Sequence, residues 1–381
     1  MAERVLFLTG RLAAPALERT LAQISPREFE YAVRDLGLSV AALMTADMIE
    51  RRLDGVGGAD RVLVPGLCGG ELTQLARRFQ VPFEKGPKDL KDLPEFFGTK
   101  ARAVSLNDYS VRIFAEIVDA PERTVEQIVQ RAERYRRDGA DVIDIGCLPG
   151  QVFDHMEDGI AALKGEGFEV SIDSVDGNDL LRGARAGADY LLSLKESTLD
   201  LRTESGAIPV LIPEQPGDMD SLYRAAEVMA AEGRAFFVDA ILDPIHFGFS
   251  DSIARYKALR ERVPEAAIFM GTGNVTELTD ADTTGMAALL LGIASELDAA
   301  AILTTEVSRH ALTAVKEADL ARRIMHAARA DHSLPRGYHA GLMAHRDRKP
   351  FPYTPDEIAH TAAAIKDPSF RIQVSEAGLH I

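Results

Sequence analysis

Short apolar runs alternate with amphipathic stretches along the first part of the chain. Runs rich in β-branched residues predict strands, whereas apolar residues spaced three or four apart predict helices. The expected strands are Val5–Thr9, Phe29–Val33 and Arg61–Pro65, and the expected helices are Leu12–Gln23, Ala46–Leu53 and Gly70–Phe79. This alternation predicts a small, Rossmann-like α/β domain in which helices cover a parallel sheet.

A stretch rich in proline and glycine follows. Pro82, Pro87 and Pro94 stand among charged residues together with Gly86 and Gly98. Clusters of these residue types interrupt regular structure. We therefore expect a linker here and a first domain over residues 1–100.

From Arg112 onward, a unit of one strand followed by one helix recurs. The expected strands are Ile113–Val118, Val142–Ile145, Glu169–Ile172, Tyr190–Leu194, Ile208–Ile212, Ala235–Leu242, Ala267–Met270 and Ala301–Leu303. The clearest helices between them are Val125–Arg137, Ser221–Ala231, Asp251–Arg262 and Thr283–Leu297. Eight such strands predict an α/β fold of the (β/α)8 TIM-barrel type over residues 101–331.

The fourth connection is the weakest part of this prediction. Only 13 residues separate Leu194 from Ile208, which leaves little room for a full helix. An open, doubly wound sheet therefore remains the alternative.

A carboxyl-terminal extension over residues 332–381 follows the barrel. Within it, Thr354 can act as an N-cap, Pro355 suits the first helical position, and Glu357 completes a capping box. These three residues predict the start of a helix.

Acidic residues outnumber basic ones in the 381-residue chain. Asp and Glu number 59 against 43 Lys and Arg, which gives a formal net charge of −16. This surplus repels phosphate backbones and anionic lipid, so neither nucleic acid nor a membrane is expected as a partner. The longest apolar stretch, Gly285–Leu303, contains Glu296 and Asp298, and the uncharged part before them is too short to span a bilayer.

Two further features suggest where the protein resides. The first apolar run, Val5–Leu8, is too short for a secretory signal. Cys68 and Cys147 form no CxxC pair, which fits a reducing compartment and argues against structural zinc. We therefore expect a cytoplasmic protein, and a homo-oligomer of a size that the sequence does not fix.

Polar residues follow the predicted barrel strands at their carboxyl ends, where the active site of a parallel barrel lies. They are Asp119, Asp144, Asp173, Ser193, Lys195, Glu214, Asp243, His246, Asn274 and Glu306. The set is rich in carboxylates, and a buried carboxylate needs donors or a cation nearby. It therefore indicates a ligand with several N–H donors, a metal ion, or basic partners.

Several of these positions fall in motifs with a known order. The motifs are Gly139-Ala140-Asp141-Val142-Ile143-Asp144-Ile145-Gly146, Ser171-Ile172-Asp173-Ser174, Gly187-Ala188-Asp189, Leu242-Asp243-Pro244 and Phe247-Gly248-Phe249. Their sequence over about residues 112–329 resembles the pterin-binding barrels, which comprise dihydropteroate synthase and the methyltetrahydrofolate corrinoid methyltransferases. With its added amino-terminal domain, the chain looks most like the dihydropteroate synthase-like proteins of methanogens and methylotrophs associated with tetrahydromethanopterin.

The resemblance implies roles for individual residues. A pterin presents adjacent N–H groups that a carboxylate can accept in parallel. By this likeness Asp243 and Asp173 accept the pterin edge, Asp144, Ser193 and Asn274 complete its site, and Asp119 and Lys195 are the candidate catalytic residues. The alternatives are structural: a loop start for Asp243, a helix cap for Asp173, a strand-end carboxylate for Asp144, and a solvated Lys195 paired with Glu196.

The chain also departs from the synthase pattern. The family's Ser-Arg-Lys is replaced by Gly271-Thr272-Gly273-Asn274-Val275-Thr276, and its Arg-x-His by Thr304-Thr305-Glu306. The former resembles the Gly-x-Ser-Asn-Val-Ser of the methyltransferase branch. The usual phosphate-binding cations are therefore absent, and Arg346 and Arg348 in the basic extension are the candidates to replace them, with Mg²⁺ as the candidate cofactor.

Three hypotheses remain open. In the first, the enzyme couples a 6-hydroxymethyl-dihydropterin diphosphate to an arylamine such as ribofuranosylaminobenzene phosphate, on the route to tetrahydromethanopterin. In the second, it transfers a methyl group from a reduced pterin to a partner. In the third, it is a pterin carrier or assembly protein without catalysis.

Overall fold

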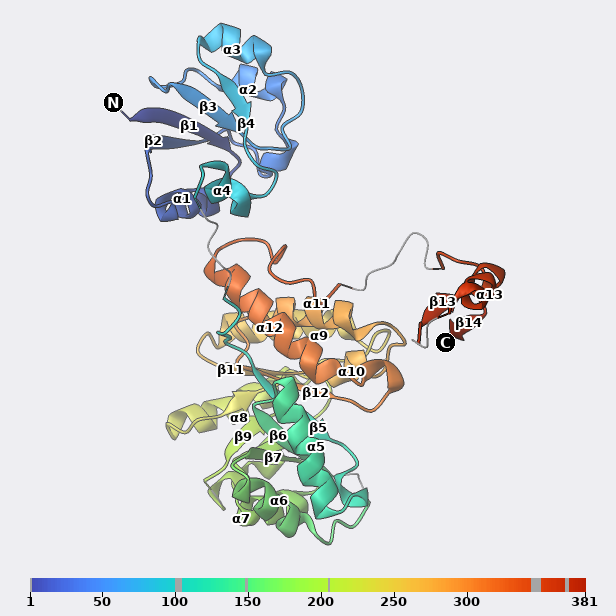
Figure 1. The fold of residues 1–381 in the computed structure, drawn as a ribbon. Helices are drawn as coiled ribbons and strands as arrows, with labels where there is room; N and C mark the ends of the chain where they lie inside the picture. The colour runs from blue at the N-terminus through green and yellow to red at the C-terminus, as the bar shows by residue number, and fades with distance from the viewer. Residues whose placement is uncertain (1, 100–104, 148–149, 205, 344–350, 367–369) are drawn as a thin grey trace. The chain divides into compact units, whose positions relative to one another are not determined.

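The computed structural model describes residues 2–99, 105–147, 150–204, 206–343, 351–366 and 370–381, and divides into two compact units, residues 1–340 and 341–381. The first unit contains an amino-terminal sheet and a barrel, and the second contains the end of the predicted extension (Figure 1). The domain boundaries predicted near residue 100 and after Asp331 stay predictions.

The amino-terminal region is a parallel four-stranded sheet in the order β2-β1-β3-β4. Its strands are β1 (Glu3–Thr9), β2 (Phe29–Asp35), β3 (Arg61–Val64) and β4 (Phe83–Lys85), and its α-helices are α1 (Ala14–Gln23), α2 (Ala46–Arg52), α3 (Thr73–Phe79) and α4 (Leu93–Phe96). Successive residues of β1 belong to two separate buried clusters, Leu6 and Leu8 to one and Val5 and Phe7 to the other. Both faces of the sheet are therefore covered, as the alternation predicts.

The stretch predicted as a linker is partly folded. It contains β4, whose Phe83 is buried, and the short helix α4. Pro82 lies at the edge of the sheet, where its carbonyl accepts the Val62 N–H at 2.9 Å. A three-residue edge strand that starts beside a proline shows no apolar pattern, so the sequence gives no signal for it.

The barrel consists of eight parallel strands that close in the order β10-β11-β12-β5-β6-β7-β8-β9. They are β5 (Arg112–Ile117), β6 (Val142–Gly146), β7 (Glu169–Asp173), β8 (Tyr190–Leu194), β9 (Ile208–Leu211), β10 (Phe237–Val238), β11 (Ala267–Gly271) and β12 (Ala301–Thr305). The closed barrel confirms the predicted fold class and excludes the open sheet.

Helices connect the strands around the barrel (Figure 1). They are α5 (Val125–Asp138), α6 (Met156–Gly165), α7 (Gly177–Ala186), α8 (Met219–Ala231), α9 (Phe249–Arg262), α10 (Gly273–Thr276), α11 (Thr283–Glu296) and α12 (Ala314–Ala330). The fourth connection holds a 3-10 helix, Glu196–Thr203, in place of an α-helix. The short spacing there predicts this outcome.

The strand β10 is much shorter than the predicted Ala235–Leu242. The Asp239 carboxylate accepts the Ile241 N–H at 2.7 Å, and Ile241 has a φ of 61°. This local turn ends the strand at Val238, although the apolar run continues beyond it.

Aromatic rings fill the barrel interior. Phe114 meets Tyr190 and Phe269 edge-on, with ring centroids 5.0 and 4.9 Å apart. Because side chains alternate along a strand, the residues two positions beyond Phe114 and Val142 also face inward. These residues are Glu116 and Asp144, which lie above the aromatic layer, toward the carboxyl ends of the strands.

The opposite end of the barrel is closed by a buried arginine on α12. Arg322 is 2% exposed and forms ion pairs with Asp141 and Asp319. It also donates to the carbonyls of Val111 and Gly139, each at 2.8 Å. A Cβ at Gly139, whose φ is 107°, would lie 2.4 Å from the Asp319 side chain, so only glycine fits there.

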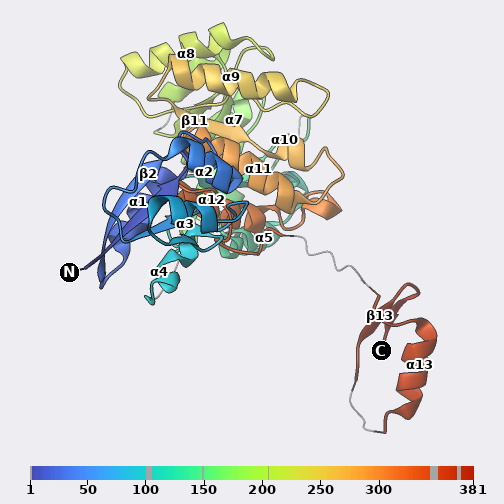
Figure 2. The same cartoon turned by 90° about the horizontal axis from the view of Figure 1, so that it is seen from above.

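The second unit contains helix α13 (Pro355–Ala364) and the antiparallel strands β13 (Gln373–Ser375) and β14 (Gly378–His380), which lie beside the helix (Figure 2). The predicted helix start is confirmed. The Glu357 N–H donates to the Thr354 hydroxyl at 3.3 Å, and the Thr354 N–H donates to the Glu357 carboxylate at 2.8 Å.

Among the described residues, no helix has the length and apolar character needed to cross a membrane.

Candidate functional site

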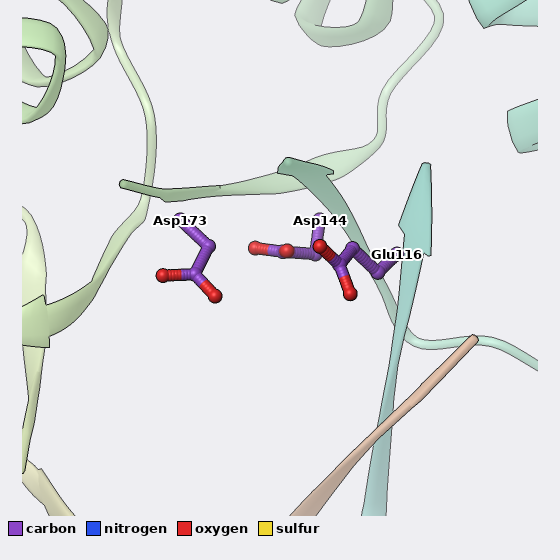
Figure 3. A group of neighbouring side chains, drawn as sticks. All are labelled: Glu116, Asp144 and Asp173. Atoms are coloured by element: carbon purple, nitrogen blue, oxygen red, sulfur yellow. The ribbon is translucent and has the colours of Figure 1, made fainter. Parts of the chain in front are cut away.

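Three carboxylates converge at the carboxyl ends of neighbouring barrel strands. Glu116 lies on β5, Asp144 on β6 and Asp173 on β7, and one oxygen from each lies within 4.8 Å of the others. Figure 3 shows the Asp144 carboxylate between the other two. The barrel therefore concentrates up to three negative charges in one small volume.

The strand register brings these residues together. Glu116 lies opposite Asp144 in the β5–β6 pairing, and Gly146 lies opposite Asp173 in the β6–β7 pairing. A Cβ at Gly146 would stand 2.6 Å from Glu116 Oε1, so a glycine is required for the Glu116 side chain to lie where it does.

Two serine hydroxyls donate to the cluster. Ser171 donates to Asp144 Oδ1, and Ser193 donates to Asp173 Oδ1 at 2.6 Å. Asp144 is fully buried, and its second oxygen, Oδ2, has no hydrogen-bond partner among the described residues. The cluster is thus short of donors for the charge that it carries.

Burial raises the pKa values of all three acids, and repulsion by neighbouring acids adds to the effect for Glu116 and Asp144. Burial, followed by the charges of Asp173 and Glu277, raises the pKa of Glu116 to about 8. Burial, followed by the charges of Asp173 and Glu116, raises the pKa of Asp144 well above its usual range. Burial also raises the pKa of Asp173, against the lowering effect of the Ser193 hydrogen bond. Perturbed acids of this kind mark functional sites.

Ser193 reaches the cluster through an irregularity in β8. The pairing of β8 with β9 shifts register between Leu191 and Leu194, and Ser193 has a φ of 65°. Along a regular strand Ser193 would face away from Tyr190 and Leu192, which point into the barrel. The left-handed backbone instead lets its hydroxyl meet Asp173.

A cavity of about 160 Å³ opens beside the cluster. Its lining includes Glu116, Asp173, Ser193 and Cys147. Burial, followed by the neighbouring acids, raises the pKa of the Cys147 thiol to about 12. Cys147 is therefore a protonated wall residue and not a thiolate nucleophile.

Large apolar side chains are exposed on the loops at this end of the barrel. Phe247, on the loop after β10, is 81% exposed, and Val152, on the loop after β6, is 78% exposed. Val175 after β7 and Val307 after β12 are also exposed. The loops around the acidic cluster thus offer apolar surface for the flat faces of a ligand.

The other predicted residues have partners of their own. Asp119 accepts two hydrogen bonds of 2.6 Å from Arg123, which lowers its pKa. Asp243, on the loop after β10, is ion-paired with Arg255 at 2.6 Å. Asn274 donates to the Leu242 carbonyl at 2.9 Å and so ties α10 to the loop that carries Asp243.

The remaining candidates are spread around the strand ends. Lys195 directly precedes the 3-10 helix of the fourth connection, and its N–H donates to the Thr198 hydroxyl at 3.0 Å. Glu214 accepts from Ser197, Glu306 is buried and ion-paired with Arg134, and His246 has a φ of 69°. Arg346 and Arg348 lie outside the described residues.

The structure therefore brings together Asp144, Asp173 and Ser193 of the predicted set. It adds Glu116, which was not predicted, because the expected strand Ile113–Val118 places Asp119 at the strand end while β5 ends at Ile117. It also adds the buried Asp239, which the Tyr256 hydroxyl contacts and whose pKa burial raises to about 6. The period-two pattern finds both, because Glu116 is the last inward-facing residue of β5 and Asp239 follows the inward-facing Phe237 of β10 by two positions.

Fold and site together define the class of protein: a (β/α)8 barrel with a cluster of buried carboxylates at its strand ends. Residues 3–88 match the model of a family of unknown function (DUF6513). An uncharacterized protein of Methanocaldococcus jannaschii is 24% identical over 417 residues, which cover 91% of this chain and 78% of that protein.

Solved dihydropteroate synthases have a fold similar to this barrel. The Yersinia pestis enzyme in complex with a sulfonamide drug gives a TM-score of 0.47 at 18% identity, over 58% of this chain and 94% of that one. The 7,8-dihydropteroate synthase of Vibrio fischeri ES114 gives a TM-score of 0.45 at 16% identity, over 59% of this chain and 94% of that one. These similarities concern the fold.

Proposed function

We propose that the barrel binds a reduced pterin and acts as a dihydropteroate synthase-like transferase. The observation that carries this proposal is the buried, donor-poor carboxylate cluster beside a cavity whose surrounding loops expose apolar side chains. A pterin matches this environment because it is flat, has apolar faces, and presents adjacent N–H donors along one edge.

Contacts among the described residues support the proposed pterin site. Asp173 lines the cavity, and its Oδ1 accepts the hydrogen bond from Ser193. Its Oδ2 is left to accept from a ligand. Arg255 holds the Asp243 carboxylate in place, and Asn274 fixes the loop beside it. These residues form the pterin site of the proposal, with Asp144 beneath Asp173.

The proposed reaction joins the pterin to an arylamine. The amine nitrogen attacks the methylene carbon of a 6-hydroxymethyl-dihydropterin diphosphate, the bond from that carbon to oxygen breaks, and diphosphate leaves with the bonding electrons while the amine loses a proton. Lys195 is the residue proposed to balance the charge of the leaving diphosphate, and Asp119 is the residue proposed to accept the amine proton. A bound Mg²⁺ would neutralise charge on the leaving diphosphate.

The arylamine of the proposal is phosphorylated, as in ribofuranosylaminobenzene phosphate, which would place the enzyme in tetrahydromethanopterin synthesis. An anionic arylamine requires a basic receptor, and Arg346 and Arg348 are its proposed members. Reversing both charges should raise the KM for the phosphorylated arylamine and leave dihydropterin affinity unchanged. The wild type should turn over p-aminobenzoate poorly, because the usual phosphate-binding cations are missing.

Calorimetry with a dihydropterin tests the pterin site. Asp243→Asn replaces an acceptor with a mismatched donor and should weaken binding by about 2 kcal/mol, or roughly thirtyfold. Asp218→Asn is the matched control, because Asp218 caps α8 and asparagine caps helices equally well. Equal affinity of wild type and Asp243→Asn would remove Asp243 from the site.

Assays with the pterin diphosphate, each arylamine and Mg²⁺ test the reaction. Formation of a pterin–arylamine product supports the synthase. Turnover that needs a corrinoid partner and a methylated pterin would identify a methyltransferase instead, and tight pterin binding without either reaction would identify a carrier.

A further inference from the structure

One oxygen of the carboxylate cluster lacks a hydrogen-bond partner among the described residues, and a pterin edge does not explain this. Asp144 is fully buried, its Oδ1 is occupied by Ser171, and its Oδ2 has no hydrogen-bond partner among the described residues. Figure 3 shows this carboxylate directed into the space between Glu116 and Asp173. A hydrogen-bond donor or a cation is needed to offset the cost of burying such a carboxylate oxygen.

The electrostatic neighbours of the cluster are acids. The charges that act on Glu116 come from Asp173 and Glu277, and those that act on Asp144 come from Asp173 and Glu116. Two predicted acids outside the cluster, Asp119 and Asp243, each have an arginine partner. The three carboxylates have no such counterion among the described residues.

We propose that Glu116, Asp144 and Asp173 bind one divalent cation, Mg²⁺ or Mn²⁺, held by the protein itself. One oxygen from each residue lies within 4.8 Å of the others, and oxygens on opposite sides of Mg²⁺ stand about 4.2 Å apart, so a small side-chain shift lets one ion contact all three. All three ligands are hard carboxylate oxygens, which these ions prefer over nitrogen or sulfur. Zinc is not favoured, because no histidine belongs to the cluster.

The site leaves room for further ligands. Glu116 and Asp173 both line the cavity of about 160 Å³, so water or a substrate oxygen can reach an ion that they hold. Mg²⁺ commonly keeps such positions for water and for phosphate oxygens. The ion would place positive charge at the barrel mouth, where the synthase cations are missing.

Gly146 supports this assignment from the neighbouring strand position. A Cβ there would stand 2.6 Å from Glu116 Oε1 and 3.1 Å from the Val118 Cα. The glycine thus creates the space in which the Glu116 carboxylate approaches Asp144. Gly146→Ala should displace one ligand while leaving all three carboxylates in the chain.

Metal binding can be measured without any substrate. Chelator-treated wild type is titrated with Mn²⁺, and the free ion is followed by electron paramagnetic resonance, with Mg²⁺ as competitor. We expect one Mn²⁺ per chain, displaced by Mg²⁺. Glu116→Gln, Asp144→Asn and Gly146→Ala should each weaken binding by about tenfold or more. Asp119→Asn is the matched control and should bind as the wild type does.

Thermal unfolding serves as the check on folding. Glu116→Gln and Asp144→Asn replace crowded acids with neutral side chains of nearly the same size, so both should fold. Mn²⁺ should raise the unfolding midpoint of the wild type and of Asp119→Asn, and should raise that of the cluster variants less. Absence of Mn²⁺ binding by the wild type, or equal binding by wild type and cluster variants, would overturn the proposal.

This inference goes beyond the proposed function and can fail separately. Dihydropterin binding in chelator, together with no Mn²⁺ binding, would overturn the metal site and leave the pterin site standing. One Mn²⁺ per chain together with no dihydropterin binding would support the metal site and overturn the pterin proposal.

Discussion

Asp141 and Asp144 stand three residues apart on one segment of the barrel, and their surroundings are opposite. Asp141 lies just before β6, where it accepts from Arg322, from the Tyr109 hydroxyl at 2.6 Å and from the Ile113 N–H at 2.8 Å. Asp144 lies within β6, fully buried, with Ser171 as its one hydrogen-bond donor among the described residues.

The difference extends to the two ends of the barrel. At the amino ends of the strands, Arg322 lies 3.5 Å from the centre of the Tyr109 ring, and Lys164 pairs with Asp189 at 2.6 Å. At the carboxyl ends, the carboxylates of the cluster face one another. The acids at the first end are paired with basic side chains, whereas the three clustered acids at the second end have no counterion among the described residues.

Loss of Arg322 should have the largest effect. Arg322→Met leaves Asp141 without its counterion and Asp319 with Arg323 alone, and removing one partner of a buried ion pair costs about 3–5 kcal/mol. Urea unfolding measures this loss, with Arg329→Met as a control because the ion pair of Arg329 with Asp298 is exposed. Equal stability of both variants would mean that this end of the barrel is not the stabilising one.

The same substitution at Asp141 and Asp144 should give opposite results. Asp141→Asn weakens three accepted hydrogen bonds and should lower the free energy of unfolding by about 2 kcal/mol. Burial and the neighbouring acids raise the pKa of Asp144 well above its usual range and so favour its neutral form, and Asp144→Asn should therefore leave stability in chelator unchanged or raise it. A loss at Asp144 as large as that at Asp141 would contradict the contrast between the two ends.

Stability should fall with rising pH because of Glu116. Its folded pKa of about 8 lies above its ordinary value of 4.5, so the folded state binds more protons between these pH values. The stabilisation is fully present below pH 4.5 and is lost as pH rises through 8, at about 1 kcal/mol per pH unit. Urea unfolding in chelator at pH 6, 7 and 8 should show this slope in the wild type.

Glu116→Gln should reduce the fall in the free energy of unfolding with pH, whereas Asp218→Asn should leave this pH dependence unchanged. Asp218 caps α8 and is not part of the cluster. A slope that is the same in wild type and Glu116→Gln would show that Glu116 is ionised in the folded state.

The strands of the barrel could be predicted from sequence because each is a continuous apolar run between turn residues. The ends of the strands are harder to predict than their presence. The residue chosen after the predicted strand Ile113–Val118 is Asp119, yet β5 ends at Ile117 and the last side chain facing the interior is Glu116. A shift of one or two residues moves a side chain from the barrel mouth to the loop, so strand-end rules need the inward register as well.

Two features of the site depend on contacts that sequence patterns do not encode. The register shift in β8 turns Ser193 toward Asp173, although the period-two pattern alone predicts the opposite face. Asp243 pairs with Arg255, which stands on the following helix, and the loop after β10 brings the two together. Both features come from tertiary packing of loops and strand ends.

Replacing Asp119, which lies outside the cluster of three acids, should have the smallest effect on stability. Its ion pair with Arg123 is partly exposed, with the two side chains 46% and 25% accessible, so Asp119→Asn should change the free energy of unfolding by less than about 1 kcal/mol. Its pKa is lowered by Arg123, so it is ionised in both states above pH 6 and adds no slope there. Loss of turnover with unchanged stability would assign Asp119 to the reaction, and unchanged turnover would leave it as a structural partner of Arg123. A stability loss comparable to that of Arg322→Met would show that paired charges at the carboxyl ends also hold the barrel together, and the contrast between the ends would then be confined to the three clustered acids.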